Sequence, residues 1–302
     1  MGKKTVSLVL SSGGARGMAH IGAIEALEEA GYEIVSIAGC SAGALIGGIY
    51  ATGQLDIFKN WICNLDKIDV FSLMDFTLSR KGFIKGEKVF QALKALVEDC
   101  DIEQLKVPFA CNAVMIPSGE EKVFTSGSLY EAIRASVSIP TVLTPARIGD
   151  SEFIDGGITN PIPFNLISPT SRGNLLVAVD LNGPKSAFVP PPPKEKKESA
   201  LKLPLWLSDY QKKFSNYFYT EEKEEKPKGL SSVELLNYSF DLIQDKLSEM
   251  VIRQHQVDML VEISREQAGT LEFHRSAELI EIGKKKMKKT IKKFESGHKI
   301  SK

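Results

Sequence analysis

Residues 34–51 read IVSIAGCSAGALIGGIYA, an apolar run, a turn of small residues and a second apolar run. The first run, Ile34 to Ala38, has the length and β-branched content of a buried strand. The second run, Ala44 to Ala51, is rich in small residues and has the length of a buried helix. Gly39 to Gly43 must turn the chain between the two runs. The stretch therefore predicts a strand that leads into a helix through one tight turn.

The preceding segment shows the same order. Val6 to Leu10 is a short apolar run followed by SSGG, which predicts another buried strand. Met18 to Ala30 carries apolar residues at helical spacing, and Gly31 is a natural helix stop. Strands and helices that alternate in this way are typical of a parallel sheet with helices on its faces. We therefore expect an α/β fold.

Further elements are expected along the rest of the chain. Periodicity predicts helices at 86–97, 128–136, 232–254 and 276–294, and strands at 108–116, 121–125, 174–181 and 257–263. Residues 147–154 are expected to form a strand or a hairpin. The proline run 190–193 and the charged run 221–226 cannot bury a core and predict a linker or loop. We expect one domain over residues 1–302, with a core at 5–183, an insertion at 184–229 and a helical part at 230–302.

Composition narrows the possible functions. The 38 Lys and Arg balance 38 Asp and Glu, so no nucleic-acid partner is expected. The cysteines lack metal-type spacing and are expected to be reduced thiols, so we expect neither a metal nor a cofactor; they are Cys40, Cys63, Cys100 and Cys111. No secretory signal or membrane-spanning run is visible, which predicts a cytoplasmic protein. The oligomeric state stays open.

The turn Gly39-Cys40-Ser41-Ala42-Gly43 fits the pattern Gly-x-Ser-x-Gly. In a nucleophile elbow this pattern holds the serine in a strained conformation, and the flanking glycines avoid Cβ clashes. The hydroxyl then lies at a helix N-terminus, where the dipole favours developing negative charge. We interpret Ser41 as a nucleophile, with a plain tight turn as the alternative.

A second glycine-rich loop, Gly13-Gly14-Ala15-Arg16-Gly17, follows the first strand. Consecutive glycines at a helix start can direct several N–H groups at one point, as an oxyanion hole requires, and Arg16 adds positive charge. Consecutive strands are usually neighbours, so this loop is expected beside Ser41. The alternative is a dinucleotide loop, but that motif lacks its first glycine at Ser12 and its acid at Gly39.

An activated serine needs a base. None of the four histidines lies in an obvious active-site turn; they are His20, His255, His274 and His298. Asp155-Gly156-Gly157 follows an apolar stretch, so Asp155 could project from a strand end and accept the serine proton. On this segment alone, an ordinary Asp-Gly turn is an equally good interpretation.

These motifs together resemble the bacterial patatin-like phospholipase family over about residues 5–183. The 13–17 loop resembles that family's oxyanion loop, and the 39–43 turn resembles its elbow. The segment 135–140, ASVSIP, with Pro145 is similar to the segment before the family's base. Its catalytic aspartate turn resembles Asp155-Gly156-Gly157 followed by Asn160, Pro161 and Pro163.

The resemblance implies a three-layer α/β/α fold with a mostly parallel central sheet, and hydrolysis of lipid acyl esters by a Ser41–Asp155 dyad without a metal. The elbow and base turn would be supported by Gly39, Gly43, Gly156 and Gly157. Two other functions stay open: hydrolysis of soluble esters or acyl thioesters by the same dyad, and lipid binding without catalysis. The insertion at 184–229 departs from the family pattern.

Two apolar stripes indicate possible contact with a membrane surface. The first consists of Trp206, Tyr210, Phe214 and Tyr217, beside Lys212 and Lys213. The second consists of Ile280, Met287, Ile291 and Phe294, among the lysines of residues 284–293. Apolar faces flanked by lysines are typical of interfacial helices, and anionic lipid attracts such clusters. The alternative is that both stripes cover the core; the first could also form a lid over Ser41.

Overall fold

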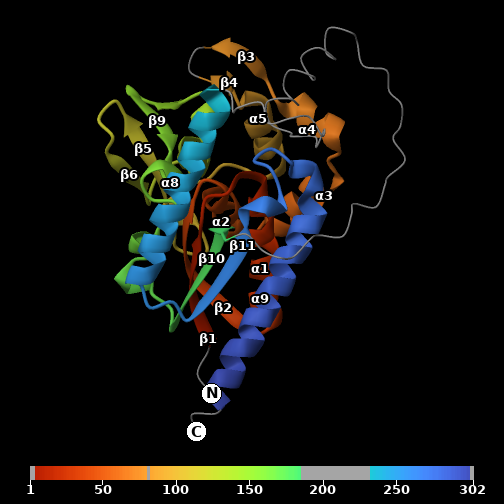
Figure 1. Cartoon of the computed structure of the whole chain (residues 1–302), viewed down its shortest axis with the longest axis vertical. Coiled ribbons are helices and arrows are strands. Elements are labelled where there is room, and N and C mark those ends of the chain that lie inside the picture. The colour runs from red at the N-terminus through yellow and green to blue at the C-terminus, as the bar shows by residue number, and fades with distance from the viewer. Residues whose placement is uncertain (1–3, 80–81, 185–231, 300–302) are drawn as a thin grey trace.

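The computed structural model describes residues 4–79, 82–184 and 232–299 (Figure 1). Its main sheet has the order β11-β10-β1-β2-β5-β9-β8, and β6 also pairs with β5. The bounds are β1 Lys4–Leu10, β2 Tyr32–Cys40, β5 Phe109–Ile116, β6 Glu121–Phe124, β8 Ala146–Ile148, β9 Ser151–Asp155, β10 Leu175–Gly183 and β11 Met259–Ser264. The five strands from β11 to β5 are parallel, whereas β6, β8 and β9 pair antiparallel.

Alternation of side chains along the central strands divides the molecule into layers. Val177 and Val179 of β10 lie in a core beneath α1 (Met18–Glu29), α2 (Ala42–Thr52), α6 (Leu129–Ser136) and α9 (Ser276–Lys299). Leu176 and Ala178 of the same strand lie in a second core, shared with α8 (Ser232–Gln254) on the opposite face. Helices thus cover both faces of a mostly parallel sheet, and the expected three-layer α/β/α fold is confirmed.

The C-terminal segment, residues 232–299, joins the same sheet. Strand β11 pairs with β10, and α9 packs along α1 (Figure 1). The α1–α9 contact is very close, because a Cβ on Gly22 would overlap the carbonyl oxygen of Ile280 and one on Gly283 would overlap that of Ala19. No described helix is long and apolar enough to cross a lipid bilayer.

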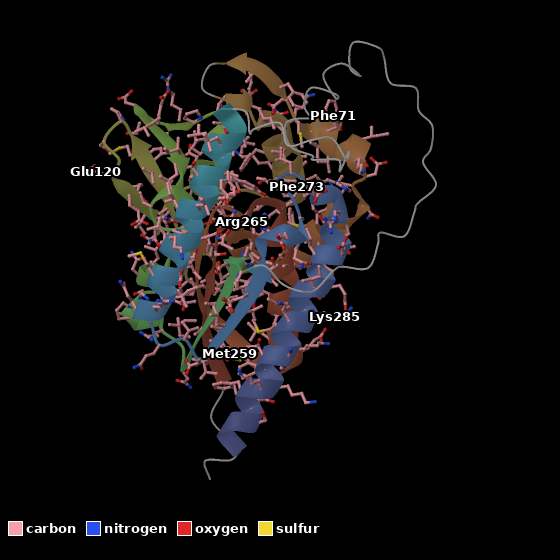
Figure 2. The ribbon with its side chains drawn as sticks, in the orientation of Figure 1. Phe71, Glu120, Met259, Arg265, Phe273 and Lys285 are labelled. Carbon is pink, nitrogen blue, oxygen red and sulfur yellow. The ribbon has the colours of Figure 1, made fainter. Side chains whose placement is uncertain are left out.

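The apolar stripe of α9 belongs to the core. Ile280, Met287 and Ile291 are buried, and Phe294 packs against them. The membrane interpretation of this stripe is therefore wrong, because its apolar surface already covers α1 and β11. The lysines lie on the rim and outside: Lys284 pairs with Glu25 at 3.1 Å, and Lys285 points away from the body (Figure 2). The stripe at 206–217 lies outside the described residues.

Residues 52–85 form elements that the sequence patterns left unassigned. They contain α3 (Leu55–Asn64), α4 (Lys67–Leu73), β3 (Phe76–Ser79) and β4 (Gly82–Ile84), and α5 (Glu87–Leu96) follows. Strand β4 pairs with β3 and with β7 (Thr141–Leu143), so a small second sheet forms beside the main one. These helices and strands lie together at the upper end of the molecule in Figure 1.

Candidate active site

Ser41 lies in a strained turn between β2 and α2. Its backbone has φ 52° and ψ −115°, a conformation that costs energy for any residue with a Cβ. A Cβ on Gly39 would overlap the carbonyl of Gly43, and one on Gly43 would overlap the carbonyl of Leu10. Both glycines are therefore needed for the strand and helix to approach this closely, as the elbow pattern predicts.

The Ser41 hydroxyl donates to Asp155 Oδ2 at 2.5 Å, and both side chains are buried. The sheet topology brings them together: β5 pairs with both β2 and β9, opposing Cys40 to Asn112 and Asp155 to Ala113. Two polar groups hold the pair. Ser136 Oγ accepts from the Ser41 N–H at 2.8 Å, and Asp155 Oδ1 accepts from the Gly157 N–H at 2.7 Å.

Burial raises the pKa of Asp155 to about 7, although hydrogen bonds from Ser41 and Gly157 oppose the shift. The cause is desolvation, because a carboxylate loses its hydration when it is enclosed. A base with a pKa near the working pH is effective in proton transfer, since it is ionised yet still basic. The Asp155 carboxylate therefore has both the contact and the basicity that deprotonation of Ser41 requires.

None of the described histidine rings contacts the Ser41–Asp155 pair by a hydrogen bond. His20 is fully buried with Nε2 on the Ser11 carbonyl, and burial lowers its pKa to about 4. His255 contacts the Val251 carbonyl through Nδ1 and stacks on a phenylalanine. Burial also lowers the pKa of His274. The ring of His298 lies outside the described side chains.

Cys40 is next to Ser41 in sequence but is unsuited to act as a nucleophile. Its thiol is fully buried, and burial raises its pKa well above the usual value. A thiol reacts as the thiolate, which this environment disfavours. Ser41 is therefore a better candidate nucleophile in this turn than Cys40.

The glycine loop lies against the elbow because β1 and β2 pair, with Leu10 opposite Gly39. It forms a short 3-10 helix from Gly14, whose φ is +57°, to Gly17. A Cβ on Gly17 would lie 2.5 Å from the Cβ of Ala42, so the loop packs on the start of α2. Within the described chain, nothing accepts from the N–H groups of Gly13 and Gly14.

The other two members of the loop are engaged in the fold. The Ala15 N–H donates to the Thr270 carbonyl at 2.9 Å. The Arg16 side chain is buried and donates to the carbonyls of Leu181 at 3.2 Å and Ala268 at 2.9 Å. Burial, with the nearby charge of Arg265, lowers the pKa of Arg16 to about 10, so the guanidinium stays charged at neutral pH. Arg16 therefore links the loop to β10 and to the loop after β11.

An apolar cavity of about 160 Å³ opens beside Ser41 and Gly14. Its walls come mainly from α3, α4, α5 and β7, and they include Phe58, Trp61, Val70, Phe90, Val142 and Leu143. Sequence reasoning missed most of this wall. The sequence did contain a pattern that predicts α3, because Leu55, Phe58 and Ile62 recur at helical spacing; all three are buried.

The chain is similar to one protein-family model and to several known proteins. A model of the patatin-like phospholipase family matches residues 8–167. Uncharacterised NTE family proteins of Mycobacterium bovis and Mycobacterium tuberculosis are 32% identical over 338 aligned residues, covering 96% of this chain and 92% of theirs. A lysophospholipase of Candida glabrata is 30% identical over 187 residues, covering 59% of this chain and 10% of its own. VipD from Legionella pneumophila aligns with a TM-score of 0.40 and 14% identity, covering 93% of this chain and 67% of its own.

Proposed function

The chain belongs to the patatin-like phospholipase family and is an ester hydrolase of that family, and from this premise we propose that it hydrolyses acyl esters of lipids through Ser41 and Asp155. The observation that carries the proposal is the 2.5 Å hydrogen bond from the strained Ser41 to the buried Asp155.

In the proposed mechanism, Asp155 accepts the hydroxyl proton while Ser41 Oγ attacks the acyl carbonyl carbon. The carbonyl oxygen becomes an oxyanion, and the N–H groups of Gly13 and Gly14 are the proposed donors to it. Asp155 then passes its proton to the departing alkoxide, which leaves as an alcohol. A water molecule, deprotonated by Asp155, releases the acid from Ser41 in the second half of the reaction and restores the hydroxyl.

The cavity supports a lipid substrate. Transfer of an acyl chain from water to an apolar site is favourable by about 0.8 kcal/mol for each buried CH₂ group. The aromatic and aliphatic side chains that line this cavity provide such a site. The name of the Candida glabrata relative further favours a lysophospholipid as the substrate class. A soluble short-chain ester would leave most of this apolar surface unused. Lipid binding without catalysis would not account for the strained backbone of Ser41 or for its hydrogen bond to a buried carboxylate.

The experiment combines labelling and turnover. A fluorophosphonate probe should label the protein, and Ser41→Ala should lose both the label and hydrolysis of a lysophospholipid panel. Asp155→Asn should lower kcat by several orders of magnitude while the fold is kept, because base and nucleophile act as a unit. Asp180→Asn is the matched control, since Asp180 is also a buried carboxylate in a strand of the main sheet, and should retain turnover.

Two outcomes would contradict the proposal. Labelling that persists in Ser41→Ala would place the reactive group elsewhere. A rate that does not rise when the ester substrate passes from monomers to micelles would favour a soluble ester as the substrate.

A further inference from the structure

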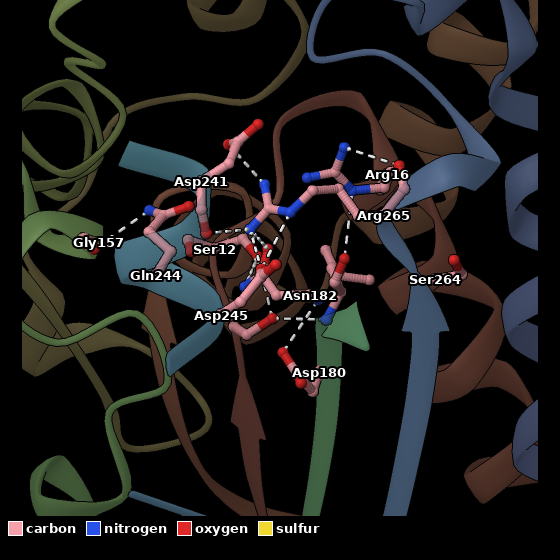
Figure 3. A network of polar contacts seen from close by, with 12 residues as sticks. Ser12, Arg16, Gly157, Asp180, Asn182, Asp241, Gln244, Asp245, Ser264 and Arg265 are labelled. Atoms are coloured by element: carbon pink, nitrogen blue, oxygen red, sulfur yellow. Dashed lines mark hydrogen bonds and ion pairs between the residues drawn. The ribbon is translucent and has the colours of Figure 1, made fainter. Parts of the chain in front are cut away.

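Helix α8, on the face of the sheet opposite α1 and α9, contacts the aspartate turn at residues 155–157. Gln244, which is 6% exposed, donates from Nε2 to the Gly157 carbonyl at 3.1 Å (Figure 3). The N–H of the same Gly157 donates to Asp155 Oδ1 at 2.7 Å. A Cβ on Gly157 would overlap the Gln244 amide and approach Ser12 Oγ to 3.1 Å. Gly157 is therefore enclosed between the carboxylate and the helix.

The position of α8 is itself fixed by Arg265, the first residue after β11. Its Nη1 donates to Asp241 at 2.7 Å and its Nη2 to Asp245 at 2.5 Å; these aspartates flank Gln244 on α8. Arg265 Nη2 also donates to Asn182 Oδ1 at 2.8 Å, which ties the helix to the end of β10 (Figure 3). Planar contacts of this kind restrict how α8 can rotate or slide along its axis.

We propose that Gln244 is a positioning residue for the Ser41–Asp155 reaction. Arg265 holds α8 in place and so keeps the Gln244 amide within hydrogen-bond distance of the Gly157 carbonyl. The proposal rests on the proposed function of the serine and aspartate. Gln244 fixes Gly157, Gly157 holds Asp155 Oδ1, and the other carboxylate oxygen then stays directed at the Ser41 hydroxyl. Both supporting residues lie beyond the segment 8–167 that matches the family.

Charged groups near this contact are already paired within the described structure. Asp241 and Asp245 face Arg265, and Asp180 accepts from the Asn182 N–H at 3.0 Å. Arg16 is bonded to carbonyls of β10 and of the loop after β11. Removal of the Gln244 amide should therefore weaken the Gly157 contact without bringing a new charge to Asp155. The carboxylate would be less stabilised, and its pKa would rise.

The test is steady-state hydrolysis of a micellar lysophospholipid by the full chain over pH 5 to 9. Gln244→Met keeps the side-chain length and removes the donor, and it should lower kcat about three- to tenfold with KM unchanged, as expected for one lost hydrogen bond. The acid limb of its kcat profile should move to higher pH. Gln244→Asn, whose shorter amide cannot reach Gly157, should behave in the same way.

The matched control is Ser248→Ala, one turn further along the same buried face. Ser248 is 1% exposed, and its hydroxyl has no partner among the described residues, so its loss should leave both kcat and the pH profile unchanged. Arg265→Lys should lower kcat as well, and its effect should be less than additive with Gln244→Met, because both act through one contact.

The possible outcomes distinguish the positioning role of Gln244 and Arg265 from the proposed function of Ser41 and Asp155. Ser41-dependent turnover whose kcat and pH profile do not respond to Gln244→Met or Gln244→Asn overturns the positioning role alone. Additive effects of Arg265→Lys and Gln244→Met overturn the role of Arg265. Wild-type turnover equal to that of Ser41→Ala overturns the proposed function and the positioning role together.

Discussion

Helices α8 and α9 belong to the same C-terminal segment, but they turn opposite kinds of side chain toward the body of the molecule. Helix α9 buries apolar residues and exposes lysines; the buried set includes Leu279, Ile280, Met287 and Ile291. Helix α8 buries Gln244 and Ser248 and exposes an apolar set, Leu235, Leu236, Tyr238, Leu242, Ile243 and Met250. The two helices therefore contribute to the protein in different ways.

The difference teaches that burial alone does not tell what a helix does. The contribution of α9 is hydrophobic, since it covers α1 and removes apolar surface from water. Helix α8 adds Val251 and Ile252 to the smaller apolar core, but its contacts around the site are polar. Gln244 bonds the aspartate turn, and Asp241 and Asp245 pair with Arg265. We therefore expect substitutions of the buried residues of α9 to change stability, and substitution of Gln244 in α8 to change the reaction.

Gly283→Val should give the largest loss of stability. The new side chain would overlap the backbone of α1 at Ala19, so α1 and α9 must separate, and we expect a loss of about 4 kcal/mol or more. Urea unfolding measures it. Gly297→Val, in the same helix with open space around its Cβ position, should change stability by less than about 1 kcal/mol. Equal losses in both variants would mean that α9 does not pack closely on α1.

Two methionines compare the helices directly. Met287→Ala in α9 removes a fully buried side chain and should cost about 2–5 kcal/mol, while kcat per folded molecule stays the same. Met250→Ala in α8, where the side chain is 58% exposed, should change stability by no more than about 0.5 kcal/mol. Equal shifts of the denaturation midpoint in Met287→Ala and Met250→Ala would contradict the expected difference between the two helices.

A pH series sharpens the contrast, because a buried carboxylate lies on the α8 side of the sheet. Burial raises the pKa of Asp180 to about 6 from 3.8, so between these values the folded state binds more protons than the unfolded state. The contribution of Asp180 to stability is thus present below pH 4 and is lost as the pH rises through 6. Asp180→Asn should be more stable than wild type by about 1–3 kcal/mol at pH 8 and equal to it near pH 4.

The control for this pH series is Met287→Ala in α9. The loss in Met287→Ala should be the same at pH 5 and pH 8, because no charge changes at that site. A stability difference between Asp180→Asn and wild type that stays constant across the series would show that Asp180 is not buried as an ionisable group.

The smallest effect is expected on the outer face of α8. Leu242→Gln and Ile243→Gln should each change the unfolding free energy by no more than about 0.5 kcal/mol, because these side chains are 46% and 54% exposed. Thermal unfolding of the two variants provides the measurement. A loss above about 1 kcal/mol would mean that this face is covered in the folded protein.

Much of the fold could be predicted from sequence because its signals are local. Residues 232–254 were predicted as a helix and form α8 over the same range, and 34–38 lies within β2. The segment 52–85 was not assigned, although α3 is as long as the predicted helix α5 and only α4, β3 and β4 are short. A local signal did exist for α4, where the side chains of Asp66 and Asp69 form a reciprocal capping box.

The site was harder to predict because its contacts are distant in sequence. Ser41 stands in a local motif, but Asp155 lies 114 residues further along, and its own segment fits an ordinary turn equally well. Arg16 was interpreted as a charge for the oxyanion loop, yet it bonds carbonyls 165 and 252 residues away. Gln244 gives no pattern at all, since a single polar residue within a helix does not reveal which carbonyl it will meet.

Strand β1 leaves the ribosome long before helix α9, although Lys4 and Glu295 form an ion pair at 2.6 Å in the folded protein. The strand inserted beside β1 is β10, about 170 residues later, and the apolar face of α1 is covered only when α9 arrives. Contacts this distant in the chain make folding slow and leave apolar surface exposed during synthesis. Ser41 and Asp155, with the strands β2, β5 and β9 that align them, are therefore translated before the strands and the helix that complete the sheet and cover α1.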